Sequence, residues 1–475
     1  MKSSITNKIV KSIGVFGGVQ VISIICAIVR TKIISVVIGP VGIGLMGLFL
    51  SATEMIGSLT TLGFRNSSVR DVASETNPLR RRTLITVVRR WAWILGVFGA
   101  AVIAALSPII SLYTFGNYSH WWCYAILSAV VLISSLMKGE EVVLQGTARL
   151  GNLASGTVIG SVVGVALCIP LYFLYGEASI APSLIVYWAV AGSFMWHFGR
   201  KATAASPKQP VSASDTYRLG KSFIKLGVFL TLSDSVAQLA SYLFITYLNA
   251  SAGTEQVGLY QAGFNIINKY AGLLFTAMSM EYFPRLASVS QSRIRTQLFL
   301  TKQINITLAV IFPFVTLIII LCPLIVRILY SSEFIDIVPY VTIGVLGTSL
   351  RAISWCMAFV IIAKGRGSIY LVTESISAVS GLLLNIVFYQ TMGITGLGVA
   401  YILWYLLYWF IMIVVGRRYY GINNHRSSLA ILAVVILMPT IVAAATLAGA
   451  TTMGILLAVV SLAISVAMGR RVLAK

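Results

Sequence analysis

The chain has 475 residues, of which 58% are hydrophobic and only 10% charged, and its formal net charge is +22. Water-soluble domains carry about 25% charged residues, so this composition excludes a water-soluble protein. Apolar stretches of about 18 or more residues recur along the chain and predict a protein that crosses a membrane many times.

These stretches predict fourteen membrane spans. Their approximate positions are 13–37, 43–64, 91–113, 120–137, 153–175, 180–199, 226–248, 258–280, 303–329, 338–363, 369–389, 394–415, 428–448 and 452–469. With the N-terminus in the cytoplasm, every Lys and Arg outside the spans falls in a cytoplasmic segment. The positive-inside rule therefore predicts that both termini are cytoplasmic. The excess of positive charge reflects topology and attraction to membrane lipids, so we expect no nucleic acid partner.

Two segments of equal length, 44–74 and 258–288, each predict an apolar helix with one polar face. The stripe of the second lies 214 residues after that of the first. The two stripes are Gly47, Ser51, Glu54, Ser58, Thr61 and Arg65, and Gln261, Asn265, Asn268, Gly272 and Ser279. This repeat indicates a duplicated membrane protein with a polar lumen.

Six spans precede a Pro- and Ser-containing linker, and an even number gives both repeats the same orientation. We therefore predict an all-α polytopic membrane protein with about 14 transmembrane helices, 12 in the core and 2 at the C-terminus. Its two six-helix bundles are related by a pseudo-two-fold axis along the membrane normal. The predicted parts are bundle 1–205, cytoplasmic linker 206–220, bundle 221–420 and two extra helices in 421–475.

Seven ionisable residues lie well inside the predicted spans. They are Arg30, Lys32, Glu54, Asp234, Lys269, Arg351 and Glu374. Left unpaired, they would cost on the order of 20 kcal/mol in a bilayer, so each must be paired, hydrated in a cavity or close to an interface. Because cations outnumber acids, a hydrated lumen here suits an anionic ligand such as a phosphate.

The candidate substrate-binding residues follow from this charge pattern and from the polar stripe. They are Arg30, Glu54, Lys269, Arg351, Asn265 and Asn268. An alternative for Arg30 is an interhelical ion pair with Glu54 that has no role in binding. Asp234 and Glu374 are candidates for coupling to protons or other ions, with simple pairing as the alternative.

No His lies in a recognisable catalytic arrangement with a carboxylate and a Ser or Cys, and the five Cys lack metal-ligand spacing. We therefore expect no enzyme, no metal site and no cofactor. A cluster of aromatic residues occupies span 394–415, where it either packs in the core or against lipid, or stacks on sugars. It comprises Tyr401, Trp404, Tyr405, Tyr408 and Trp409.

Several short stretches carry a family resemblance over roughly residues 1–420. They are VVIGPVGIGL at 36–45, LMKG at 136–139, VGLYQ at 257–261, FPRL at 283–286, and IIAK at 361–364 followed by YLVTE at 370–374. The chain resembles the Wzx-type O-antigen and lipid-linked oligosaccharide flippases, which are polysaccharide biosynthesis proteins of the MOP superfamily.

The resemblance implies transport of an undecaprenyl-diphosphate-linked oligosaccharide, an O-antigen-type repeat unit of lipopolysaccharide biosynthesis. This ligand would move from the inner to the outer leaflet of the bacterial cytoplasmic (inner) membrane by alternating access. Arg30 would bind the diphosphate, with Lys269 and Arg351 as further candidates, and a proton or sodium gradient could drive transport. Membrane lipids, and polymerase and chain-length proteins of the same pathway, are candidate partners.

Three other functions compete with this one. A cation-coupled multidrug exporter of the same superfamily would need an acidic cavity, whereas basic residues dominate here. A polymerase or ligase would need a large outer loop with catalytic Arg or His, and no predicted outer loop contains Arg or Lys. A passive membrane scaffold would leave the charges inside the spans unexplained.

Overall fold

The computed structural model describes residues 2–61, 64–203, 211–423 and 426–473. In this part of the chain every regular element is helical. The elements are α1 (Lys2–Val37), α2 (Pro40–Thr61), α3 (Phe64–Ser74), α4 (Pro78–Phe115), α5 (Trp121–Gly146), α6 (Leu150–Tyr175), η1 (Gly176–Ser179), α7 (Ile180–Thr203), α8 (Ala213–Ala252), α9 (Thr254–Val289), α10 (Arg293–Leu329), η2 (Ser332–Ile337), α11 (Val338–Gly344), α12 (Gly347–Ala363), α13 (Gly367–Tyr420), α14 (Arg426–Leu447) and α15 (Thr451–Leu473).

The predicted all-α membrane class is confirmed. Among the described residues, nine helical stretches are long and apolar enough to cross a membrane. A tenth is added if Ser332–Gly344 and Gly347–Ala363, which meet at 52°, form one span. Two of the nine, Leu150–Thr203 and Gly367–Tyr420, are 54 residues long, and each contains two predicted spans. The predicted spans 226–248 and 258–280 lie in α8 and α9, outside these ten stretches.

Several helices extend beyond the predicted apolar spans because local capping signals define their ends. The side chain of Asn77 accepts hydrogen bonds from the backbone N–H groups of Leu79 and Arg80, and Pro78 occupies the first turn. These are strong helix-start features, so α4 begins 13 residues before the predicted span. Its basic first turns are therefore helical.

The helix α13 contains one sharp break, at Gly393, where two predicted spans meet. This residue has φ 62° and ψ −147°, a conformation that residues with a Cβ rarely adopt. The break lets two apolar helical segments follow one another without a long connecting loop.

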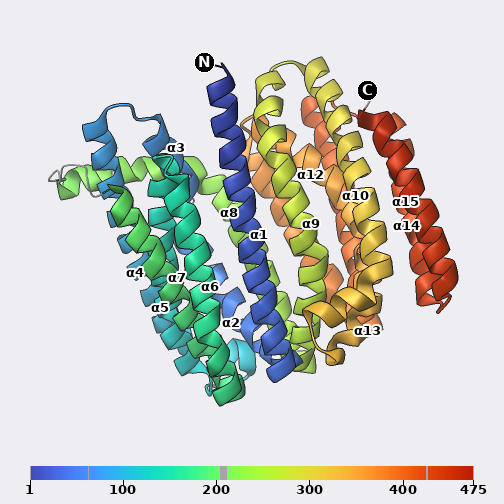
Figure 1. Cartoon of the computed structure of the whole chain (residues 1–475), viewed down its shortest axis with the longest axis horizontal. Coiled ribbons are helices and arrows are strands. Elements are labelled where there is room, and N and C mark those ends of the chain that lie inside the picture. Colours follow the sequence, from blue (N-terminus) through green and yellow to red (C-terminus); the bar gives the residue numbers. More distant parts are fainter. Residues whose placement is uncertain (1, 62–63, 204–210, 424–425, 474–475) are drawn as a thin grey trace. The chain divides into compact units, whose positions relative to one another are not determined.

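The chain divides into two compact units, Met1–Val257 and Gly258–Lys475. In the first unit, α8 packs against α2, α3 and α4. In the second, α14 and α15 pack against α10, as Figure 1 shows at the red end of the colour bar. The predicted bundles 1–205 and 221–420 are based on the internal repeat. The division into two compact units does not test that repeat, so the two bundles stay a prediction.

The helix α4 holds both ends of the predicted linker. Arg82 Nη1 donates to the backbone carbonyl of Thr203 at 2.8 Å. On the other side, Arg90 Nη1 donates to the carbonyl of Val211 and Trp91 Nε1 to that of Thr216, both at 2.8 Å. Residues 206–210 of the predicted linker lie outside the described part of the chain.

Candidate functional site

The second unit brings a cation, an amide and a phenol together. The guanidinium Nη1 of Arg351 on α12 donates to Oδ1 of Asn268 on α9 at 2.8 Å and to the hydroxyl of Tyr401 on α13 at 3.3 Å. The Tyr401 hydroxyl also donates to Asn268 Oδ1 at 3.1 Å. Three helices thus converge on one closed triangle of hydrogen bonds.

Two aromatic rings complete the surroundings of Arg351. Its Cζ lies 5.2 Å from the ring centroid of Phe275 and 5.7 Å from that of Tyr405. Both distances are within the range of cation–π attraction. We call these five residues the Arg351 cluster: Asn268, Phe275, Arg351, Tyr401 and Tyr405.

In the described part of the chain, the charge of Arg351 has only neutral partners. Among the described residues no carboxylate forms an ion pair with it, and its Nε and Nη2 donate no hydrogen bond. A largely desolvated guanidinium without a counter-ion is expensive in a membrane protein. Its remaining donors form a planar fork that matches the oxygens of a phosphate or carboxylate. The cluster can therefore bind an anion.

A carboxylate lies further along the same aromatic surface. The Tyr408 hydroxyl donates a hydrogen bond to Glu374, and the Tyr408 ring lies 6.4 Å from that of Tyr405. Tyr401 and Tyr408 are buried, which favours core packing for these two residues of the predicted aromatic cluster. Tyr405 thus lies between Arg351 and the tyrosine that contacts Glu374.

Two other candidates of the second unit lie outside the Arg351 cluster. The side chain of Lys269, next to Asn268 in sequence, is exposed. Asn265 is half-buried and lies close to the hydroxyl of Tyr330. Of the candidates from the second unit, the structure therefore brings Asn268 and Arg351 together.

Arg30, in the first unit, faces an aromatic ring. Its Cζ lies 4.6 Å from the ring centroid of Tyr187 on α7, and its buried Nε has no hydrogen-bond acceptor among the residues that the structure describes. In the described part of the chain Arg30 forms no ion pair, so the alternative clamp with Glu54 is not observed. The Glu54 side chain is exposed.

The polar stripe of α2 meets α8. The Ser58 hydroxyl donates to that of Ser235 at 3.2 Å, which places two polar helix faces in contact. Asp234, the neighbour of Ser235, has an exposed side chain. The candidate for ion coupling in this unit is therefore close to the stripe and accessible.

Sequence reasoning missed two features of these units. Phe275 and Tyr405 contact Arg351 from different helices, and a spacing pattern within one helix does not report such a contact. Glu140 lies beyond the predicted span 120–137, but α5 continues through it. Its carboxylate accepts two hydrogen bonds of 2.7 Å from Arg89 and is nearly inaccessible to solvent. The signal available in the sequence was the presence of opposite charges, Arg89 and Glu140, just outside two predicted spans.

A family model described as "Polysaccharide biosynthesis protein" matches residues 33–339 of this chain. The chain belongs to this family. Among curated proteins, the Lipid III flippases of Escherichia coli (strain K12) and Shigella flexneri are each 22% identical over 395 residues. The aligned region covers 79% of this chain and 90% of each relative.

Solved structures of other membrane proteins show the same fold. The Lipid II flippase MurJ in an inward closed conformation matches with a TM-score of 0.72 and 14% identity, covering 97% of this chain and 99% of that one. An inward-facing multidrug resistance MATE family transporter of the MOP superfamily matches with a TM-score of 0.68 and 15% identity, covering 84% and 94%. At these identities the likeness to the solved structures shows the fold alone. The Lipid III flippases, the Lipid II flippase and the MATE transporter are named as flippases or transporters and not as enzymes.

Proposed function

We propose that this protein is a flippase for a lipid-linked oligosaccharide in the bacterial cytoplasmic membrane. Its substrate is an undecaprenyl-diphosphate-linked repeat unit of the O-antigen type, moved from the inner to the outer leaflet by alternating access. The family and the names of the relatives, which are flippases of lipid-linked molecules, support transport of a lipid-linked substrate.

The observation that carries the proposal is the Arg351 cluster. A half-buried guanidinium with free donors attracts the diphosphate, while the neighbouring half-buried ring of Tyr405 offers a flat apolar face for a sugar. Arg30, with its buried unpaired Nε beside Tyr187, is a second candidate for a phosphate oxygen.

The MATE transporters share the fold, and a cationic drug is the alternative substrate. A cationic drug needs carboxylates in its binding site. The Arg351 cluster contains none among the described residues, and Glu374 already accepts a hydrogen bond from Tyr408. The charge at this site therefore favours an anionic substrate.

The test uses proteoliposomes that hold a fluorescent undecaprenyl-diphosphate oligosaccharide, whose exposure on the opposite leaflet is followed with an added lectin. Arg351→Gln should lower the transport rate by about ten- to a hundredfold, which is the effect expected from losing hydrogen bonds to a charged group. Arg327→Gln is the matched control, because Arg327 is exposed in the last turn of α10. Transport by Arg351→Gln at the wild-type rate, or transport of ethidium and not of the lipid, would overturn the proposal.

A further inference from the structure

A groove on the first unit has one basic end and one apolar end. It consists of two adjoining cavities of about 290 and 920 Å³ that share Arg89, Trp93 and Arg200 among their lining residues. The smaller cavity lies between α4, α5 and α7, and the larger one reaches the start of α8. Among the described residues, none that lines either cavity comes from α1 or α2, which carry the candidates Arg30 and Glu54.

The basic end carries an excess of positive charge. Four arginines and one carboxylate line the two cavities: Arg82, Arg89, Arg90, Arg200 and Glu140. Glu140 is occupied by its two hydrogen bonds from Arg89. Arg200 is exposed and stacks 5.7 Å from the Trp196 ring, and within the described residues it has no ion pair. An anion at this end would therefore meet unneutralised guanidinium groups.

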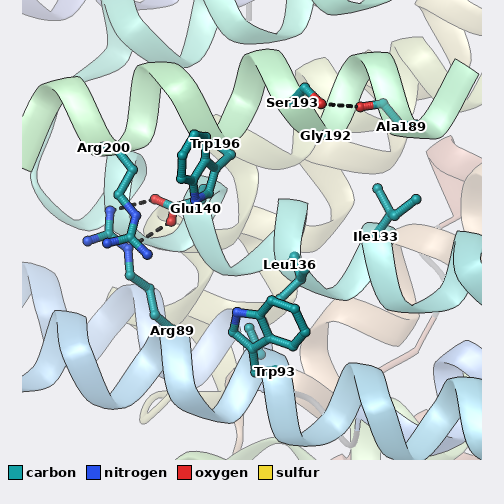
Figure 2. A pocket seen from close by; sticks show the side chains of 11 residues that line it. Arg89, Trp93, Ile133, Leu136, Glu140, Ala189, Gly192, Ser193, Trp196 and Arg200 are labelled. Carbon is teal, nitrogen blue, oxygen red and sulfur yellow. Dashed lines mark hydrogen bonds and ion pairs between the residues drawn. The ribbon is translucent and has the colours of Figure 1, made fainter.

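The other end is apolar. Figure 2 shows Arg89, Arg200 and Glu140 gathered at one end and Ile133 and Ala189 at the other. Trp93 and Trp196 project between these ends from facing helices. A Cβ on Gly192 would come within 2.6 Å of Ile133, so glycine is needed for α7 to approach α5 so closely here.

The length of the groove matches one leaflet of a bilayer. Ala189 and Arg200 are 11 residues apart on α7, which corresponds to about 16 Å along a helix. Half of a hydrocarbon core of about 30 Å has a similar depth. The two tryptophans lie between the charged and the apolar ends, as is usual at a membrane interface.

We propose that this groove binds an anionic glycerophospholipid of the bilayer. Its headgroup phosphate lies at Arg200 and Arg82, and one acyl chain lies along Trp93, Leu136 and Ile133. The lipid would brace α4, α5 and α7 at the end where α4 also holds Thr203 and Thr216. Basic pockets between transmembrane helices bind such headgroups in other membrane proteins.

Native mass spectrometry of the full-length protein in detergent tests the proposal, with dioleoyl phosphatidylglycerol as the probe. Dioleoyl phosphatidylcholine, with the same chains, and glycerol 1-phosphate, which has no chains, are the comparison ligands. Arg200→Gln should weaken binding of phosphatidylglycerol about fivefold, the contribution of one arginine at an anionic lipid surface. Arg295→Gln, which changes an exposed arginine of the second unit, should leave it unchanged.

A second pair of variants tests the apolar end. Ser193→Phe places a ring in the groove and should reduce binding of the phospholipid to a similar extent. Ser380→Phe is its control, because both serines donate to the carbonyl four residues earlier. Equal binding of the two phospholipids, full competition by glycerol 1-phosphate, or equal effects of variant and control would each overturn the proposal.

Discussion

Asn268 Oδ1 accepts a 2.8 Å hydrogen bond from Nη1 of Arg351, so a neutral amide occupies the place where a carboxylate would balance this cation. The site therefore keeps its positive charge. Because α9 and α12 supply the two groups, their geometry depends on helix packing and not on one flexible loop.

Replacing Asn268 with Asp should neutralise the positive charge of the Arg351 cluster with almost no change in the shape of the side chain. The new carboxylate would pair with Arg351, so we expect transport of the lipid-linked substrate to fall about tenfold or more, while thermal stability stays equal or rises. The rate in proteoliposomes and the melting temperature in detergent measure the two effects. Asn265→Asp is the control, since Asn265 contacts Tyr330 instead. Equal losses in both variants would contradict a role for this charge.

Removing the carboxylate of Glu140 should destabilise the first unit. Its pair with Arg89 is largely buried, with side-chain exposures of 5% and 14%. Glu140→Gln leaves an uncompensated guanidinium, and breaking such a pair costs about 3–5 kcal/mol. Denaturant unfolding measures this loss. Glu281→Gln breaks an exposed pair with Arg285 and should cost less than about 1 kcal/mol. A similar cost for both would contradict burial as the cause.

Alanine at Gly393 should lower stability by about 1–3 kcal/mol, because a Cβ makes its backbone conformation strained. Gly272→Ala is the matched control. A Cβ there meets no atom within 4 Å, and alanine favours helix over glycine by up to about 1 kcal/mol. Thermal unfolding of both variants gives the comparison. A loss at Gly272 as large as that at Gly393 would rule out the backbone explanation.

If an ion gradient drives transport, we propose Glu374 as the coupling group. Its carboxylate accepts a hydrogen bond from the buried Tyr408, and Tyr405 connects this pair to Arg351. Glu374→Gln should remove the dependence of transport on an imposed pH or sodium gradient. Asp234→Asn, at an exposed position, should keep it. The opposite pattern would assign coupling to α8.

The helices could be predicted from the sequence because a bilayer demands long apolar segments. Most predicted spans lie within a single helix, whereas span 338–363 is divided between α11 and α12. The ends of the helices could not be predicted, because Asn77 and Pro78 start α4 within polar sequence. Arg351 and Asn268 were both identified as candidates, one by its cost in a membrane and one by the polar stripe. Their contact, and the rings of Phe275 and Tyr405, depend on how three helices pack, which periodicity within each helix does not encode.

Hydrogen bonds join α4 to Thr203 at the end of α7, and to Val211 and Thr216 at the start of α8. The helices α7 and α8 are therefore connected through α4 as well as through the backbone. A protease that cuts the backbone there would produce two fragments, and α4 would still hold α7 and α8 together. Limited proteolysis would then give two bands on a denaturing gel from a particle that elutes as one. The same property makes this position suitable for expressing the protein as two separate polypeptides.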